Sequence, residues 1–315
     1  MSRQVIVVTG CQGKVGKHVV RELESQKYHV IGIDLVRGVY DTYIAGGGWP
    51  ETYIQCDLQD SGSVYSTLAR FKPSAVIHIA AIPDPTHNPP HVVFSTNITT
   101  TFNVVEACVR LSIPRLVNIS SETVPGFFFP ERVGPSPSGL ISGLPLYVPV
   151  DEKHPVLPQD PYALSKSFGE QLCDAAVTRS PDIKIISIRP SWCQDSGNIA
   201  RNLGPLVRDF KAPNAGLLAY VIISDLARAI VAAAQSTLPG HEIFYIAASD
   251  TAGGHDLAAW VTAHYGESIP LRTLSTPTSP SLSCQKAASL LGWEPRHTWR
   301  DYLGADGELL PQHPL

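Results

Sequence analysis

Three closely spaced glycines near the N-terminus, Gly10, Gly13 and Gly16, follow directly on the apolar run at 5–8. A continuous β-branched run is typical of a strand buried on both faces, and the apolar positions after Gly13 recur at helical spacing. A strand, a glycine turn and a helix in this order predict backbone N–H groups that converge on a phosphate at the helix N-terminus. The feature therefore restricts the chain to folds built on a parallel βαβ unit.

The acidic residue Asp34 ends the next apolar run, at 29–33. In such units a carboxylate at this place accepts hydrogen bonds from an adenosine ribose and disfavours a 2′-phosphate, so we expect NAD rather than NADP. The cofactor contacts expected in and after the turn are Gly10, Gln12, Gly13, Val15 and Gly16.

Strand and helix patterns alternate along the next part of the chain. Apolar strand-like runs at 53–56, 75–79, 115–119 and 183–188 alternate with helical patterns at 61–71, 99–111 and 159–178. This alternation predicts an α/β fold with a doubly wound parallel Rossmann sheet. We expect an NAD-binding domain at 1–190 and a smaller C-terminal α/β substrate-binding region at 191–315. About 217–248 of that region is expected to return to the sheet.

Composition excludes several classes of protein. The net charge of −4 gives no electrostatic case for binding nucleic acid, and no apolar run has the length of a membrane span. The six cysteines are scattered without a CxxC pair, which predicts free thiols in a reducing, cytoplasmic compartment and no metal site. His78 is expected to make a buried core hydrogen bond, and the stretch 125–158, rich in Gly and Pro, to form a loop beside the site.

Tyr162 and Lys166 are four residues apart within one of the helical patterns, so both side chains lie on one helix face. A nearby ammonium favours the phenolate and lowers the pKa of the Tyr162 hydroxyl. Such a tyrosine can take a proton from an alcohol or return one to a carbonyl. Ser121 follows an expected strand end upstream of this pair.

The ordered motifs resemble those of the extended short-chain dehydrogenase/reductases, the NAD-dependent epimerase/dehydratase group, over roughly residues 3 to 300. The motifs in question are Thr9-Gly10-x-x-Gly13-x-x-Gly16, Asp57-Leu58, His78-Ile79-Ala80-Ala81, Asn97, Ser120-Ser121, Tyr162-x-x-x-Lys166, Arg189-Pro190 and Leu291-Gly292-Trp293-x-Pro295. Each motif alone is weak, whereas the complete set in this order is specific.

The resemblance implies a role for each matched residue. Tyr162 would be the general acid/base, Lys166 would bind the nicotinamide ribose, and Ser121 would hydrogen-bond the reacting oxygen. The further cofactor contacts that it implies are Asp57, Leu58, Ala80, Ala81, Asn97 and Arg189. Many relatives dimerise through the helix that carries the tyrosine, so a homodimer is expected as well.

Departures from the family pattern bear on the substrate. Nucleotide-sugar epimerases of this group have an Asn where this chain has Trp192, and an Arg where it has Leu218. A diphosphate needs cationic or bidentate partners, so the substrate is expected to be a small non-nucleotide molecule such as a free sugar, a sugar acid or a hydrophobic alcohol. The residues expected to contact it are Glu122, Phe127 and Trp192.

Three functions are compatible with these residues. The first is an NAD-dependent oxidoreductase that exchanges a hydride with a secondary alcohol or carbonyl, with Tyr162 as general acid/base. The alternative is an epimerase or dehydratase that retains its NAD and returns the hydride to the substrate. A third, non-catalytic dinucleotide sensor is disfavoured because the Ser121, Tyr162 and Lys166 set is intact.

Overall fold

The computed structural model describes residues 3–36, 52–127 and 144–311, which form two compact units. Both units are discontinuous in sequence. The first comprises Met1–Ser120, Pro161–Ile188 and Ala227–Ile243, and the second Ser121–Asp160, Arg189–Leu226 and Phe244–Leu315. The domain boundary expected at residue 190 stays a prediction.

Within the described residues, the first unit is built on a seven-stranded sheet in the order β3-β2-β1-β4-β5-β6-β9. Its strands are β1 (Val5–Thr9), β2 (His29–Asp34), β3 (Thr52–Gln55), β4 (Ala75–His78), β5 (Arg115–Ile119), β6 (Lys184–Pro190) and β9 (His241–Ile246), the last two continuing into the second unit. The pairs from β3 through β6 are parallel. The predicted Rossmann sheet is confirmed.

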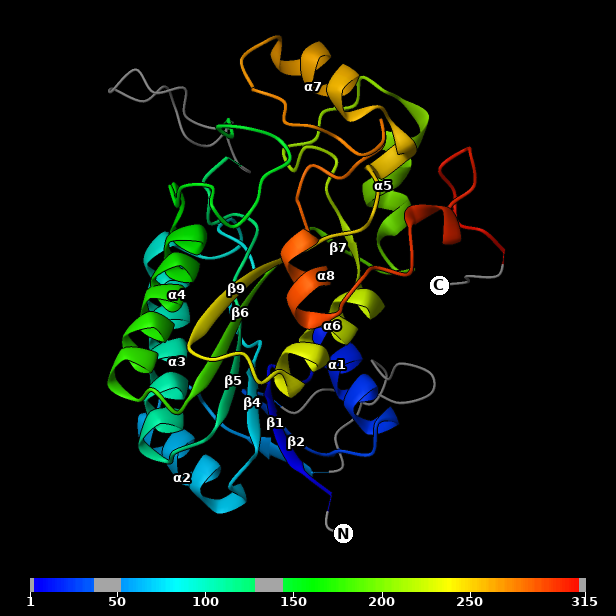
Figure 1. The fold of residues 1–315 in the computed structure, drawn as a ribbon. Helices are drawn as coiled ribbons and strands as arrows, with labels where there is room; N and C mark the ends of the chain where they lie inside the picture. Colours follow the sequence, from blue (N-terminus) through cyan, green and yellow to red (C-terminus); the bar gives the residue numbers. More distant parts are fainter. Residues whose placement is uncertain (1–2, 37–51, 128–143, 312–315) are drawn as a thin grey trace. The chain divides into compact units, whose positions relative to one another are not determined.

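Helices cover both faces of this sheet. Figure 1 shows α2 (Ser61–Phe71), α3 (Pro90–Arg110) and α4 (Pro161–Arg179) on one face, and α1 (Lys14–Ser25) with α6 (Ile223–Gln235) on the other. All four residues of β4 are buried, as the apolar run predicts for a strand covered on both faces.

The first residues of α2 and α3 illustrate how local sequence sets the start of a helix. The Asp60 side chain accepts hydrogen bonds from the backbone N–H groups of Gly62 and Ser63 and so caps α2. Helix α3 begins at Pro90, well before the expected start at residue 99, so that expectation was wrong. A proline suits the first turn of a helix, where its missing N–H group has no intrahelical acceptor.

The second unit has a hydrophobic core of its own, which includes Tyr220, Tyr245, Trp260 and Phe127. Its remaining elements are β7 (Cys193–Gln194), α5 (Ile199–Arg208), β8 (Val221–Ile222), η3 (Ala252–Gly254), α7 (Leu257–Tyr265), α8 (Gln285–Leu291) and η4 (Trp299–Asp301).

The predicted loop at 125–158 falls partly outside the described residues, because 128–143 are not among them. Its described end is tied into the second unit, where Val148 and Val150 form parallel bridges with Leu271 and Leu282. Among the described helices, none is both long and apolar enough to span a membrane.

Candidate functional site

The glycine turn after β1 takes a shape that side chains would obstruct. Gly10 has a φ of +69°, and a Cβ there would lie 2.7 Å from the backbone nitrogen of Ala80. A Cβ on Gly16 would overlap the Gly10 carbonyl oxygen and lie 2.8 Å from the Cα of Cys11. The turn closes through the Gly13 N–H, which donates to the Gly10 carbonyl at 3.1 Å. Two of the three predicted glycines are therefore sterically required.

Asp34, at the end of β2, is bonded to this turn. One carboxylate oxygen accepts the Gln12 N–H at 3.0 Å, and the other accepts the Leu35 N–H at 2.8 Å. Each oxygen retains further acceptor capacity, which matches the two hydroxyls of a ribose. The Gln12 side chain donates to the Val36 carbonyl at 2.7 Å, so hydrogen bonds from Gln12 join the turn to the end of β2 and the residues after it.

The segment after β3 is hydrogen-bonded to a side chain of α3. Leu58 is 6% exposed, and its carbonyl accepts a hydrogen bond from the Asn103 side chain at 2.9 Å. The Asp57 carboxylate accepts the Gln59 N–H at 2.9 Å. Asn103 did not appear among the sequence-predicted residues, because nothing in a helical pattern marks a side chain that bonds a distant backbone.

A buried polar chain links β1, β4 and α3. The Thr9 hydroxyl lies 2.8 Å from Nδ1 of His78, whose Nε2 lies 3.2 Å from the Thr101 hydroxyl. Thr9 also accepts the Ile79 and Ala80 N–H groups. Burial, aided by the nearby Lys166 charge, lowers the pKa of His78 to about 3. The two buried hydrogen bonds of the ring confirm the expected core role of His78.

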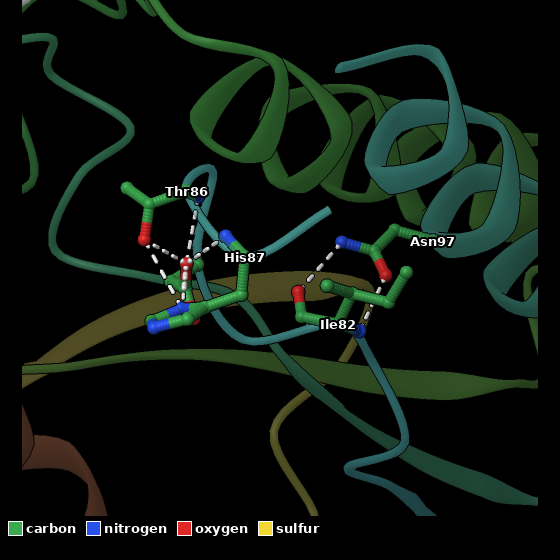
Figure 2. Close-up of polar contacts among 5 residues, drawn as sticks. Ile82, Thr86, His87 and Asn97 are labelled. Atoms are coloured by element: carbon green, nitrogen blue, oxygen red, sulfur yellow. Dashed lines mark hydrogen bonds and ion pairs between the residues drawn. The ribbon is translucent and has the colours of Figure 1, made fainter. Parts of the chain in front are cut away.

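Asn97 of α3 continues this chain toward α4. Its side chain accepts the Ile82 N–H at 2.8 Å and donates to the Ile82 carbonyl at 3.0 Å, as Figure 2 shows. It also donates to the Ser165 hydroxyl at 3.2 Å. Asn97 thus fixes the backbone that follows Ala80 and Ala81 and reaches the residue beside Lys166.

Thr86 and His87 form a second polar cluster on the same segment, also drawn in Figure 2. Both side chains bond the Asp84 carboxylate, the His87 Nδ1 at 2.8 Å. These contacts hold a surface turn together. Among the described residues, no group of three or more His, Cys, Asp or Glu side chains is arranged to bind a metal ion.

Tyr162 and Lys166 lie on the first two turns of α4. The Lys166 Nζ lies 5.7 Å from the centroid of the Tyr162 ring and donates to the Ile119 carbonyl at 2.7 Å. Burial lowers the pKa of Lys166 to about 8, and the negative charge of Glu170 acts in the opposite direction. The predicted sharing of one helix face is confirmed.

Ser121 and Glu122 belong to the second unit. The Ser121 hydroxyl accepts hydrogen bonds from the Thr123 N–H at 3.1 Å and the Thr123 hydroxyl at 2.9 Å. Glu122 accepts the Ser191 hydroxyl at 2.7 Å, and burial raises the pKa of its carboxyl to about 8. A carboxyl in this condition is largely protonated at neutral pH.

The other residues predicted in this unit lie in different surroundings. Arg189 is 1% exposed and donates to the Tyr245 hydroxyl at 3.2 Å, so its guanidinium is used in the interior. Phe127 is 2% exposed within the hydrophobic core, whereas Trp192 is 37% exposed. Their assignment to cofactor and substrate stays a prediction.

Positions 218–220, where the family pattern has an arginine that this chain lacks, are buried. Leu218 is fully buried and Ala219 is 1% exposed, and the Tyr220 hydroxyl donates to the Asp250 carboxylate while accepting the Trp299 N–H at 2.9 Å. Tyr220 is thus part of a core network that also includes Arg300, paired with Asp250. No cationic side chain comes from positions 218–220.

A Ser–His–Asp arrangement in the first unit was not expected from the sequence. The Ser187 hydroxyl lies 2.8 Å from Nε2 of His241, whose Nδ1 lies 2.7 Å from Asp174. Ser187 has no exposed surface, so no substrate can reach its hydroxyl. The three residues join β6, β9 and α4 instead.

The second unit also has an open cavity of about 420 Å³. Its walls include Cys284, Gln285, Trp293 and Glu294, and none of the sequence-predicted site residues lines it. The cavity therefore gives no support to the predicted substrate contacts.

Known proteins resemble this chain over most of its length. A bifunctional UDP-glucose 4-epimerase and UDP-xylose 4-epimerase of Arabidopsis thaliana is 25% identical over 339 residues, covering 93% of this chain and 92% of that protein. A Methanocaldococcus jannaschii relative is 30% identical over 171 residues, which are 53% of this chain but only 49% of that relative.

Solved structures share the fold. A Bifidobacterium longum UDP-glucose 4-epimerase, crystallised with NAD+ and UDP, superposes with a TM-score of 0.70 at 19% identity and covers 95% of both chains. Residues 6–194 match the model of a family described as NAD dependent epimerase/dehydratase, which is more than half of the sequence. The chain therefore belongs to the NAD-dependent epimerase/dehydratase family, whose cofactor is NAD.

Proposed function

We propose that this protein is an NAD-retaining epimerase that acts on a secondary hydroxyl of a sugar. The observation that carries the proposal is the placement of the buried Lys166 ammonium beside Tyr162 on α4, held by the Ile119 carbonyl. The positive charge favours the phenolate of Tyr162, which is the form that takes a proton from an alcohol.

The residues of the first unit fit the cofactor. The glycine turn would receive the pyrophosphate and Asp34 the adenosine ribose, because the turn leaves no room for side chains and the carboxylate oxygens accept hydrogen bonds. Bound NAD supplies the hydride acceptor of the reaction. Leu58, Ala80, Ala81 and Asn97 are proposed to border the cofactor.

Proton handling is the work of the chain's own side chains. Tyr162 would take the hydroxyl proton as the carbonyl forms and return it when the alcohol is restored. Ser121 is proposed to hydrogen-bond the same oxygen, the role that the family resemblance gives it. Glu122, as a buried neutral acid beside Ser121, is a further candidate contact.

The similarity to known proteins favours the epimerase over net oxidation, which was the first expectation from the sequence. The relatives of nearly full length are named as UDP-sugar 4-epimerases. Net oxidation of a small non-nucleotide alcohol remains the second candidate. It is favoured by Trp192 and by the apolar, buried Leu218 and Ala219 where a diphosphate-binding Arg was expected.

Turnover in the presence of UDP-glucose, free sugars and simple alcohols separates the two candidates. An epimerase is expected to convert the sugar with no net change in the NADH absorbance band. Net growth of that band with a free sugar or alcohol would establish the dehydrogenase instead. The measurement is absorbance during turnover combined with chromatographic analysis of the sugar.

Asp34→Asn is expected to reduce NAD affinity by about tenfold or more, because hydrogen bonds to a charged group contribute about 1.5–3 kcal/mol. NADP binding should fall less, because the carboxylate disfavours a 2′-phosphate. Titration calorimetry with both nucleotides measures the change, with the exposed Asp182→Asn as a matched control. An unaltered NAD:NADP affinity ratio would refute the assignment of Asp34.

We also propose a homodimer formed through α3 and α4, in a reducing cytoplasmic compartment. Phe102, Leu164 and Phe168 of these helices are 47%, 37% and 40% exposed, and all six cysteines are free thiols. Exposed aromatic side chains on neighbouring helices favour association.

A further inference from the structure

Two consecutive residues at the end of β5 bind two residues one turn apart on α4. The Ile119 carbonyl accepts from Lys166 at 2.7 Å, and the Ser120 hydroxyl donates to the Glu170 carboxylate at 2.6 Å. Ser120 is itself fixed, because its N–H donates to the Ile188 carbonyl of β6 at 2.8 Å. The strand end thus holds α4 in register at both side chains.

Burial makes the charge of Lys166 costly. The side chain is 8% exposed, and burial lowers the pKa of Lys166 to about 8. A Lys166 side chain that loses its proton no longer favours the Tyr162 phenolate. A nearby negative charge raises the pKa of Lys166 and so extends the pH range over which the side chain stays charged.

The groups around Lys166 identify where that charge comes from. His78 faces it from β4 and is neutral, since burial lowers its pKa to about 3. Asn97 of α3, which bonds the neighbouring Ser165, carries no charge. Tyr162 lies one turn earlier on α4, and Glu170, 4% exposed, lies one turn later.

We propose that Glu170, held by Ser120, is a positioning residue that supplies the countercharge for Lys166 and thereby sets the pH range in which Tyr162 works. This inference rests on the proposed roles of Tyr162 and Lys166. Glu170 is placed to act on Lys166 and not on the substrate, because its carboxylate is buried against the strand end.

A direct titration of Lys166 tests the countercharge without any substrate. In full-length protein labelled with 13C at the lysine ε-carbons, the Lys166 signal is the one lost in Lys166→Met. Glu170→Gln is expected to lower the Lys166 titration midpoint by about one pH unit, because an opposite charge shifts a neighbour by this order. Asp174→Asn, on the same helix with a 67% exposed carboxylate, should leave the midpoint in place.

A midpoint unchanged in Glu170→Gln, or lowered equally in Asp174→Asn, overturns the proposal. If Glu170→Gln does not fold, Glu170→Met fills the same space without a buried polar group and is expected to lower the midpoint equally. With a turnover assay, the alkaline limb of kcat/KM should move down by the same amount. A structural defect alone would lower kcat without moving that limb. If the native protein shows no turnover but Glu170→Gln still lowers the Lys166 titration midpoint, the proposed function is refuted and the countercharge role of Glu170 stands.

Discussion

Tyr162→Phe is expected to reduce turnover by about 100- to 10,000-fold, because the variant lacks the hydroxyl that exchanges the proton. The aromatic ring and the neighbouring Lys166 remain, so NAD affinity should stay nearly unchanged. Steady-state turnover and calorimetric titration with NAD measure the two effects separately.

Tyr65→Phe is the matched control for this substitution. Tyr65 lies on α2 and is 44% exposed, so loss of its hydroxyl should leave both turnover and NAD affinity as they are. A Tyr162→Phe protein that turns over at the native rate would remove Tyr162 from the reaction.

Gly16→Ala is expected to damage both folding and cofactor binding. The added Cβ would overlap the Gly10 carbonyl oxygen and press on the Cys11 backbone, and none of these atoms belongs to a flexible side chain. Overpacking of this kind lowers the free energy of unfolding by about 1–3 kcal/mol. Displacement of the turn should weaken NAD binding by about tenfold or more. Denaturant unfolding and NAD titration check the two effects.

A second helical glycine provides the comparison. Gly62 is near the start of α2, and a Cβ there meets only the Asp60 side chain, at 3.3 Å. Gly62→Ala should stabilise the protein or leave it unchanged, because alanine favours a helix over glycine by up to about 1 kcal/mol. Native NAD affinity in Gly16→Ala would contradict a pyrophosphate site at the turn.

The sheet was predictable from sequence because its signals are local. A β-branched run, a glycine turn and a 3.6-residue period each occur within about a dozen residues, as from Val5 to Gly16. The position of Tyr162 and Lys166 on one helix face was predictable for the same reason, because residues four apart in a helix are neighbours. The start of α3 was missed because Pro89 and Pro90 read as loop residues, although Pro90 suits a first turn.

Links between distant segments could not be predicted in this way. The Ser120–Glu170 and Asn103–Leu58 hydrogen bonds join residues far apart in sequence, and no periodicity records such pairs. The identity of the substrate could not be predicted either. Trp192 and Leu218 show only that two residues of the family pattern that would bind a diphosphate are absent. Recognition of a particular sugar depends on side chains that no motif specifies.

The buried His78 makes the first unit sensitive to acid. Its ring must be neutral in the folded chain, where its pKa is about 3 against an ordinary value of 6.5. Unfolding therefore takes up a proton at His78 when the pH lies between these values. The stability due to neutral His78 is complete above the ordinary value and declines as the pH falls toward 3. The Thr9–His78–Thr101 hydrogen bonds stabilise the ends of β1 and β4 at neutral pH, and burial of the same ring destabilises the fold in acid.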